Sequence, residues 1–393
     1  MKNRLLALSV ITYTYNDHAL AAGLLRSMAG WDVRPRETLV IDDGSQTPFV
    51  VPDEAPPTRL VRLEPNQGPA RAKAVGLGAA QNRFLLSLDA DIRLPPDWIS
   101  RCLREAAKPE VGIVATPILT DAGSGLLAKY QQLRYGLMVN FSGNADVAPA
   151  GLWLLRREVW QRHGFHDYPH RLHEDVHFSQ TLRRAGLARR ILPGPAARQI
   201  RRLSRQTMVR RGWVWQGRQY LAAARQNPVD PVNAFLLAMQ NRILRHHAAN
   251  PAFLYYDCLY LAFALTSLLG EAGYFEAAAS LPAVLADALP HPWAGALLRA
   301  DLAGLGVAFE DGMPASPLVE AIRQGVCSIL PGDAAGALES ARPHLEAEDR
   351  REDWDVSFYD ALATGEGAKA SGEGQDGQAG ARGMTLADVI PSA

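Results

Sequence analysis

The sequence predicts an α/β protein with a mixed, mostly parallel sheet flanked by helices, followed by an α-helical C-terminal region. Over residues 1–120, short apolar runs alternate with amphipathic helical patterns, which is typical of βαβ units. Polar clusters directly follow several of the apolar runs. Beyond about residue 230 the chain becomes rich in Ala and Leu at helical spacing. With 393 residues, 48% of them hydrophobic, the chain is long enough for two or three domains.

Each expected element has a local signal. Helix-spaced Leu20, Leu24, Leu25 and Met28 predict the first helix, with Asn16 or Asp17 as its cap. Pro69 after Gly68 opens a second helix that runs through Ala80. Further helical patterns cover 98–106, 125–139 and 176–185. The apolar runs predict strands at 5–12, 38–41, 59–63, 83–88 and 111–117.

The composition suggests three parts. Residues 1–225 carry the α/β pattern, and residues 226–362 form a helical domain in which 268–278 has the pattern of an αα-hairpin turn. Residues 363–393 are rich in Gly and poor in large apolar side chains, so we expect a flexible tail. The helical domain is expected to pack on the first domain or to dock a partner.

The cysteines and the apolar runs favour a cytoplasmic protein. Cys102, Cys258 and Cys327 are far apart, which argues against a disulfide framework or a cysteine-based zinc site. The start of the sequence lacks a leader-type cleavage site, and no run of 18 apolar residues exists. A position at the inner face of the membrane, by peripheral contact, stays open.

Charge is distributed unevenly although the net charge is zero. Residues 1–256 hold 34 Lys and Arg against 20 Asp and Glu, and the rest of the chain reverses this excess. The segment 183–225 contains twelve Arg and no acidic residue. Such a segment favours an anionic ligand, for which nucleic acid, phosphate-bearing small molecules and lipid headgroups are candidates. Most of these arginines are expected on solvated helix faces.

Two pairs of carboxylates are the best candidates for chemistry. Asp89 and Asp91 follow an apolar strand, and carboxylate oxygens are the ligands that Mg²⁺ and Mn²⁺ prefer. Such an ion could screen the phosphates of a nucleoside diphosphate. Glu174 and Asp175 stand at a predicted helix start, where a carboxylate could act as a general base.

The order of five motifs resembles family 2 glycosyltransferases of the GT-A fold, over about residues 6–186 and perhaps to 225. The motifs are VITYTYND, LVIDDGS, NQGPARAKAVG, LLSLDADIRLPPDW and RLHEDVHFSQTLRRAG. The resemblance implies an inverting, metal-dependent transfer of a sugar, from a UDP-sugar in the first instance, to an acceptor hydroxyl. It also implies a role in bacterial-type surface glycan or glycoconjugate synthesis. Processive relatives carry a QxxRW motif that this chain lacks, so we expect non-processive transfer.

The resemblance also implies roles for single residues. Asp175 would be the base and Glu174 would orient or bind the acceptor. Asp91 would hold the Mn²⁺ or Mg²⁺ ion, with Asp89 at the ribose or beside the metal, and Asp42 would read the nucleobase. The remaining expected donor contacts are Thr12, Tyr15, Asn16, Asp43, Asn66, Gly68, Arg71, Gly151 and Arg202.

Further residues of these segments are expected to have structural roles or to differ from the relatives. Lys73 is expected on a solvated helix face, and Trp213 and Trp215 in the core. Relatives often carry a metal-binding His where this chain has Arg201 or Arg202. The acceptor could be a glycan, a lipid-linked sugar or a protein.

Three alternatives stay open. A degenerate nucleotide-sugar-binding or scaffold protein would keep the fold without activity. A nucleotidyltransferase would need a Gly-rich loop after the first strand, and residues 12–17 contain no Gly. A nucleic-acid binder would use the arginines with Trp213, Trp215 and Tyr220, although no nucleic-acid partner is expected.

Overall fold

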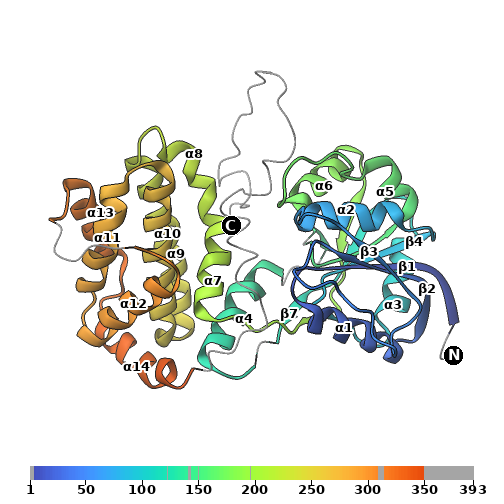
Figure 1. Ribbon diagram of the computed structural model, residues 1–393, viewed down its shortest axis with the longest axis horizontal. Helices are drawn as coiled ribbons and strands as arrows, with labels where there is room; N and C mark the ends of the chain where they lie inside the picture. The colour runs from blue at the N-terminus through green and yellow to red at the C-terminus, as the bar shows by residue number, and fades with distance from the viewer. Residues whose placement is uncertain are drawn as a thin grey trace.

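The computed structural model describes residues 4–348, apart from 122, 140–142, 149, 195 and 309–313. These residues form a lobe built on a β-sheet and a lobe built of helices (Figure 1). The predicted tail 363–393 and the end of the predicted helical domain lie outside the described residues. The predicted fold class, a mostly parallel sheet with flanking helices and a helical C-terminal region, is confirmed.

The sheet lobe contains one large sheet and one small sheet. The large sheet has the order β3-β2-β1-β4-β9-β6-β10-β8 and the small one β5-β11-β7. The strands are β1 (Arg4–Thr14), β2 (Val33–Asp42), β3 (Thr58–Arg62), β4 (Phe84–Leu88), β5 (Ile92–Arg93), β6 (Val111–Ala115), β7 (Ile118–Thr120), β8 (Gly143–Asn144), β9 (Leu152–Arg156), β10 (Ala188–Ile191) and β11 (Ala197–Gln199).

The directions of the strands place the polar motifs together. β3, β2, β1 and β4 are parallel neighbours, so their carboxyl ends meet at one edge. β9 runs antiparallel to both β4 and β6, which makes the sheet mixed. In the small sheet, β11 pairs antiparallel with β5, directly after the Asp89–Asp91 segment. This pairing brings the chain that follows residue 199 next to that segment.

Helices cover both faces of the large sheet. α1 (His18–Ser27) and α3 (Trp98–Ala106) pack on one face through Leu24, Leu25 and Trp98. α2 (Pro69–Ala79), α5 (Arg157–His163) and α6 (Glu174–Arg184) cover the other through Leu77 and Phe178. In Figure 1 these two groups lie on opposite sides of the strands. The predicted helices at 98–106 and 69–80 are thereby confirmed within one residue.

The helical lobe is a bundle around α10. Gly273, with φ +97°, ends α10 and permits the turn into α11, so the predicted αα-hairpin is confirmed. The helices of the helical lobe are α7 (Arg205–Gly212), α8 (Leu221–Ala224), α9 (Val229–Ala249), α10 (Leu254–Ala272), α11 (Phe275–Asp287), α12 (Pro292–Gly304), α13 (Pro317–Ile329) and α14 (Ala334–Glu346). α4 (Leu126–Val139), from the first half of the chain, also packs into this lobe.

The core of the helical lobe extends past the predicted boundary at residue 225. Leu126 and Tyr130 of α4, Met208 of α7 and Trp213 are buried in the same cluster as the residues of α10. Tyr130 Oη donates to Asp257 Oδ1 at 2.6 Å inside this cluster. The division at 225 therefore remains a proposal, whereas the packing core joins segments from both sides of it.

Ion pairs within the helical lobe explain part of the uneven charge. Arg205 contacts Asp301 at 2.6 Å and Glu348 at 2.6 Å, and Arg218 contacts Glu271 at 2.9 Å. The basic segment thus faces the acidic helical region of its own chain. The expectation that most of the twelve arginines lie on solvated faces is wrong, because only five are exposed: Arg183, Arg184, Arg198, Arg202 and Arg225.

One helical segment of the described residues, Pro251–Ala272, is long and apolar enough to cross a membrane by length and composition. Its mean hydropathy is 1.5, and 94% of this window is buried inside the protein. Length and composition of this kind are shared by the central helices of folded bundles, which is the place that α10 occupies here.

Candidate active site

The carboxyl ends of β1, β2 and β4 converge on one acidic edge. Tyr13 lies at the end of β1 and Asp42 at the end of β2, while Asp89 and Asp91 follow β4. This is the edge at which open α/β sheets bind ligands. The N-terminus of α6, with Glu174 and Asp175, closes the site from another part of the chain.

Asp89 lies at the centre of this edge. Tyr13 Oη donates to its Oδ1 at 2.6 Å, and the Lys73 ammonium lies 4.0 Å from the same oxygen. The side chain keeps 28% of its surface exposed, so a ligand can reach it. Burial, against the attraction of Lys73, raises the pKa of Asp89. Gly151 accepts the Asp89 backbone N–H at 3.0 Å and leaves the second carboxylate oxygen uncovered.

Lys73 ties this aspartate to the second motif. Its ammonium donates to Glu174 at 2.9 Å and to the Ala150 carbonyl at 2.9 Å, and its side chain has no exposed surface. The expectation that Lys73 lies on a solvated helix face is wrong. Helix α2 points this residue inward, against the ring of Trp153, where the carboxylates compensate the ammonium. Burial lowers the pKa of Lys73, but Glu174 and Asp89 outweigh burial and raise it.

Asp175 stands in the first turn of α6 and is partly exposed. Burial and the neighbouring Glu174 raise its pKa to about 6, against the opposing attraction of Lys73. The Val176 N–H donates to one of its oxygens at 2.8 Å. A carboxylate with this pKa is ionised near neutral pH yet basic enough to accept a proton in a transition state. Glu174 is buried under Lys73, so it positions this turn and does not reach an acceptor as expected.

Asp91, the expected metal ligand, contacts the guanidinium of Arg201. Its Oδ2 accepts from Arg201 Nε at 2.7 Å and from Gln199 at 3.0 Å. Arg201 also binds Asp17 at 2.8 Å. Asp17, expected to cap the first helix, makes no side-chain cap hydrogen bond to α1. Arg201 and Asp91 keep only 4% of their side-chain surface, so this is a buried charge cluster.

The expected divalent ion does not fit these residues as they stand. Mg²⁺ and Mn²⁺ favour an octahedral shell of oxygens. Asp91 offers one unengaged oxygen, Oδ1, which is buried beside a guanidinium, while Asp89 lies beside Tyr13 and Lys73. Among the described residues, no group of three or more His, Cys, Asp or Glu side chains could hold a metal ion.

The Asp42–Asp43 pair holds loops together. Asp42 is fully buried and accepts from the Ser45 and Phe49 N–H groups and from Arg62 at 2.6 Å. The expected base contact by Asp42 is therefore corrected, because no exposed oxygen remains for a nucleobase. Burial raises the pKa of Asp43 to about 7, although the Gln67 and Gly68 N–H groups donate to it at 2.8 Å and lower that pKa. Asp43 thus organises the 66–68 turn.

Of the remaining residues that were predicted to contact the donor, some take part in contacts near the acidic edge and others do not. Asn66 and Gly68 lie at the start of α2, beside Arg171 from the loop before α6. Asn16 joins the end of β1 to the Ser45–Gln46 turn. Tyr15 packs on Val214 with Leu172 and Trp215. Outside these contacts, Thr12 is buried under the strand end, and Arg71 and Arg202 are exposed.

Three site residues escaped the sequence analysis. Tyr13, Lys73 and Arg171 contact Asp89, Glu174 and Asn66 respectively, and all three lie within the motifs named in the sequence analysis, which assigned them no role in the site. Tyr13 lies in β1 one residue from its end, and this position at the carboxyl end of a strand could have indicated it. Trp213 is buried in the core as expected, whereas Trp215 is only partly buried.

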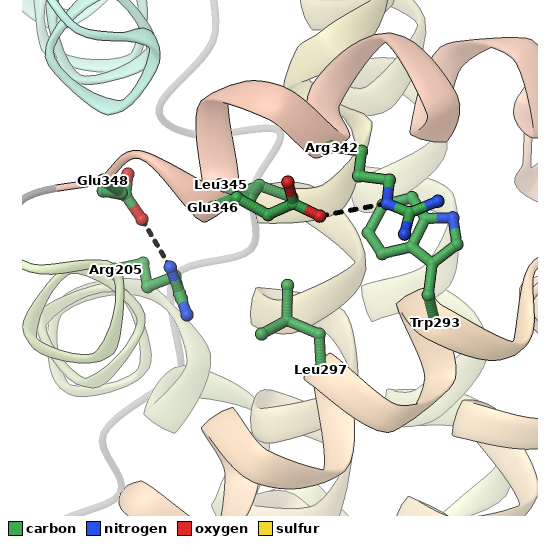
Figure 2. Close-up of a pocket in the computed structure, with 7 residues that line it drawn as sticks. All are labelled: Arg205, Trp293, Leu297, Arg342, Leu345, Glu346 and Glu348. Atoms are coloured by element: carbon green, nitrogen blue, oxygen red, sulfur yellow. Dashed lines mark hydrogen bonds and ion pairs between the residues drawn. The ribbon is translucent and has the colours of Figure 1, made fainter.

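Two hollows accompany this site. One, of about 370 Å³, lies beside the N-terminus of α6 and is lined by Leu172, His173, Val214, Arg218, Leu221, Ala222 and Arg225. The other, of about 260 Å³, lies in the helical lobe between Arg205, Trp293 and Arg342. Figure 2 shows the ion pairs Arg205–Glu348 and Arg342–Glu346 across this second hollow. The first hollow is lined by His173, which stands two residues before Asp175.

The sheet and its acidic edge define an α/β domain with its functional residues at the carboxyl ends of the strands. Residues 9–164 match the family described as Glycosyl transferase family 2. The match covers β1 to α5 and therefore includes Lys73, Asp89 and Asp91. Asp175, Arg201 and the helical lobe lie beyond it.

Two curated relatives are similar over shorter segments. The succinoglycan biosynthesis protein ExoO of Rhizobium meliloti (strain 1021) is 40% identical over 75 residues, which are 18% of this chain and 21% of that protein. An uncharacterized glycosyltransferase of Haemophilus influenzae is 30% identical over 112 residues, 28% of this chain and 38% of that protein. The chain thus matches about a fifth of the length of the first relative and less than half of the length of the second.

Two solved structures are similar to this chain over most of its length. The mannosyltransferase PcManGT of Pyrobaculum calidifontis, in complex with GDP-Man and Mn²⁺, is 18% identical with a TM-score of 0.40, over 87% of this chain and 85% of that one. S. aureus TarS 1-349 in complex with UDP-GlcNAc is 16% identical with a TM-score of 0.39, over 89% and 93%.

Proposed function

We propose that the chain is an inverting glycosyltransferase that moves a hexosyl group from a nucleoside diphosphate donor to an acceptor hydroxyl. One observation carries the proposal. Lys73 lies 4.0 Å from Asp89 and 2.9 Å from Glu174, and so joins the end of β4 to the turn that holds Asp175. Two carboxylate motifs that are far apart in the sequence therefore form one site within a family 2 domain.

The reaction follows from this placement. The acceptor oxygen attacks the anomeric carbon of the donor sugar while Asp175 takes the hydroxyl proton. The bond between that carbon and the phosphate oxygen breaks, and the nucleoside diphosphate leaves with the electron pair. One displacement inverts the anomeric configuration. The sugar and ribose lie against Asp89 and Gly151 in this arrangement, where Asp89 keeps an exposed surface.

The hollow beside α6 is the place we assign to the acceptor. It is lined by His173, two residues before Asp175, and combines apolar Leu172 and Val214 with the guanidinium groups of Arg218 and Arg225. This mixture suits an acceptor with apolar and anionic parts, such as a lipid-linked sugar phosphate. A glycan or protein acceptor remains within the proposal, as does a role in bacterial-type surface glycan synthesis by non-processive transfer.

The next question concerns the nucleobase of the donor. UDP is the first donor to test, although Asp42 no longer supports the choice. Metal dependence, which the sequence resemblance implies, would place Mn²⁺ or Mg²⁺ at Asp91 and Asp89. Arg201 and Lys73 already face these two carboxylates.

Thermal shift with UDP, GDP, CDP and TDP tests the donor site directly. A ligand that binds the folded state alone raises the Tm by mass action. We expect one nucleotide to raise the Tm and the matching nucleoside to do so less. A folded sample whose Tm responds to none of the four would overturn the proposal and favour the scaffold alternative.

A further inference from the structure

We infer that Arg201 supplies the positive charge that Asp91 would otherwise obtain from a divalent metal, so that this chain binds nucleoside diphosphates without Mn²⁺ or Mg²⁺. The inference rests on the proposed function, since it concerns the same donor site. It departs from the metal dependence that the resemblance implies for Asp89 and Asp91. The contacts of Asp91 with the chain itself carry the inference.

The backbone delivers Arg201 to this place. β11 pairs antiparallel with β5, with Gln199 opposite Ile92. The Ile200 N–H then donates to the Asp91 carbonyl at 3.0 Å. Arg201 is the next residue, so its position relative to Asp91 is set by main-chain hydrogen bonds. The backbone of Arg201 is thus held next to Asp91, and the side-chain contacts with Asp91 and Asp17 fix the guanidinium.

The contacts of Arg201 are those of a permanent internal cation. Nε lies 2.7 Å from Asp91 Oδ2 and a terminal nitrogen lies 2.8 Å from Asp17 Oδ2. The side chains of Arg201, Asp91 and Asp17 are 4%, 4% and 7% exposed. A guanidinium stays charged at every pH that the protein tolerates, and two carboxylates compensate its burial.

A second fixed cation serves the other aspartate of the motif. The Lys73 ammonium lies 4.0 Å from Asp89 Oδ1 and has no exposed surface. A divalent ion shared by Asp89 and Asp91 would therefore lie between two like charges. Repulsion of this kind is strong where water is excluded. The Arg201 guanidinium and the Lys73 ammonium thus neutralise the two carboxylates that a divalent ion would otherwise neutralise.

The first test uses the unmodified full chain. Titration calorimetry with the nucleoside diphosphate found by thermal shift is run in EDTA and again with Mn²⁺. We expect the two Kd values to agree within about threefold, less than the effect of one ordinary contact. Binding that is seen only with Mn²⁺ would overturn the inference and leave the proposed function standing. Binding in neither condition would overturn the proposed function itself.

The second test replaces the cation. Arg201→Ala removes the guanidinium and leaves Asp91 and Asp17 available to a divalent ion. We expect the Kd of the nucleotide in EDTA to rise at least about tenfold, the scale of one lost charge-assisted contact, and Mn²⁺ to restore most of the affinity. A purely structural role of Arg201 would not produce rescue by metal. Arg198→Ala, an exposed arginine of β11, is the matched control and should stay independent of metal.

Direct detection of Mn²⁺ keeps the inference testable if Arg201→Ala does not fold. Electron paramagnetic resonance counts free Mn²⁺ in the presence of the unmodified chain. We expect no stoichiometric binding by the unmodified chain. One tightly bound Mn²⁺ per chain that is lost in Asp91→Asn would overturn the inference, because it would show that the ion displaces Arg201 from the carboxylate.

Discussion

Lys73 and Glu174 form a buried ion pair of 2.9 Å between residues that are 101 positions apart. Neither side chain is more than 2% exposed. The pair fixes the first turn of α6 against α2, and the same ammonium lies 4.0 Å from Asp89. The distance between the two carboxylate motifs is thus set by a single side chain.

Replacing Lys73 with Met should destabilise the fold strongly. The change leaves Glu174 buried without its cation, which costs about 3–5 kcal/mol in the free energy of unfolding. Urea-induced unfolding followed by circular dichroism measures this loss. Lys108→Met is the control, because Lys108 is 51% exposed in its pair with Glu105 and should change stability by less than about 1 kcal/mol.

The double variant Lys73→Met with Glu174→Leu separates charge from packing. Removing both partners leaves no unpaired charge, so we expect it to be more stable than Lys73→Met alone. A double variant that is the less stable of the two would show that packing around these side chains dominates.

Nucleotide release from the donor should depend on the ionisation of Asp175. The base form is the ionised one, so the rate should rise about tenfold per pH unit below pH 6 and level off above it, given a pKa of about 6. The sign for stability is opposite. The folded pKa lies above the ordinary value of 3.8, so this group's contribution to stability is complete below that value and is lost as pH rises through about 6.

Asp175→Asn tests the same assignment. It should lower kcat by about 10²–10⁴, the usual contribution of a general base, and leave the Kd of the nucleotide nearly unchanged. Asp167→Asn, at an exposed position in the segment between α5 and α6, is the control and should keep full activity. A fully active Asp175→Asn would remove Asp175 from the mechanism.

Gly68→Ala should disturb the donor site through Arg171. Gly68 has φ +90°, and a Cβ there would lie 3.0 Å from the Arg171 side chain. We expect a loss of more than about 1 kcal/mol in stability, with weaker nucleotide binding. Gly186→Ala also places Ala at a positive φ, +71°, with nothing within 4 Å, so it should cost about 1 kcal/mol without affecting binding. Equal nucleotide affinities for the two variants would contradict this role.

A chain cut after Arg225 should not give a folded, active domain. Leu126, Tyr130, Met208 and Trp213 would lose their partners in α9 to α14 and would expose apolar surface. Size-exclusion chromatography and binding of a hydrophobic dye measure the outcome. A soluble monomer of residues 1–225 with full activity would show that the helical lobe is dispensable for packing.

The sequence predicted the elements better than it predicted the site. Local signals such as Pro69 after Gly68 placed α2, and the strand runs placed β1 to β4 within a few residues. β9 and β11 were missed, because a strand that enters a sheet in antiparallel fashion between distant segments has no local signal beyond a short apolar run. Nothing near Arg201 in the sequence indicates its partner Asp91, which is 110 residues away.

The roles of single residues in the site were also hard to predict from the sequence. The motif residues Asp42 and Asp43 were expected to face the nucleotide, yet their neighbours' backbone N–H groups bind them. Residue type alone does not tell a carboxylate that binds a ligand from one that holds a turn. Lys73 shows the converse, since a lysine on an amphipathic helix is more often solvated, and only the packing of α2 against Trp153 placed it inside.

The place of α10 has a consequence for how the chain folds during synthesis. Leu254–Ala272 is almost wholly buried, and its covering side chains come from α4 and α7 before it and from α11 to α14 after it. During synthesis this apolar helix is therefore made before α11 to α14, which cover part of its surface. The helical lobe can close only once residues up to Leu345 have been synthesised, so its completion is a late step, and the sheet lobe can form first.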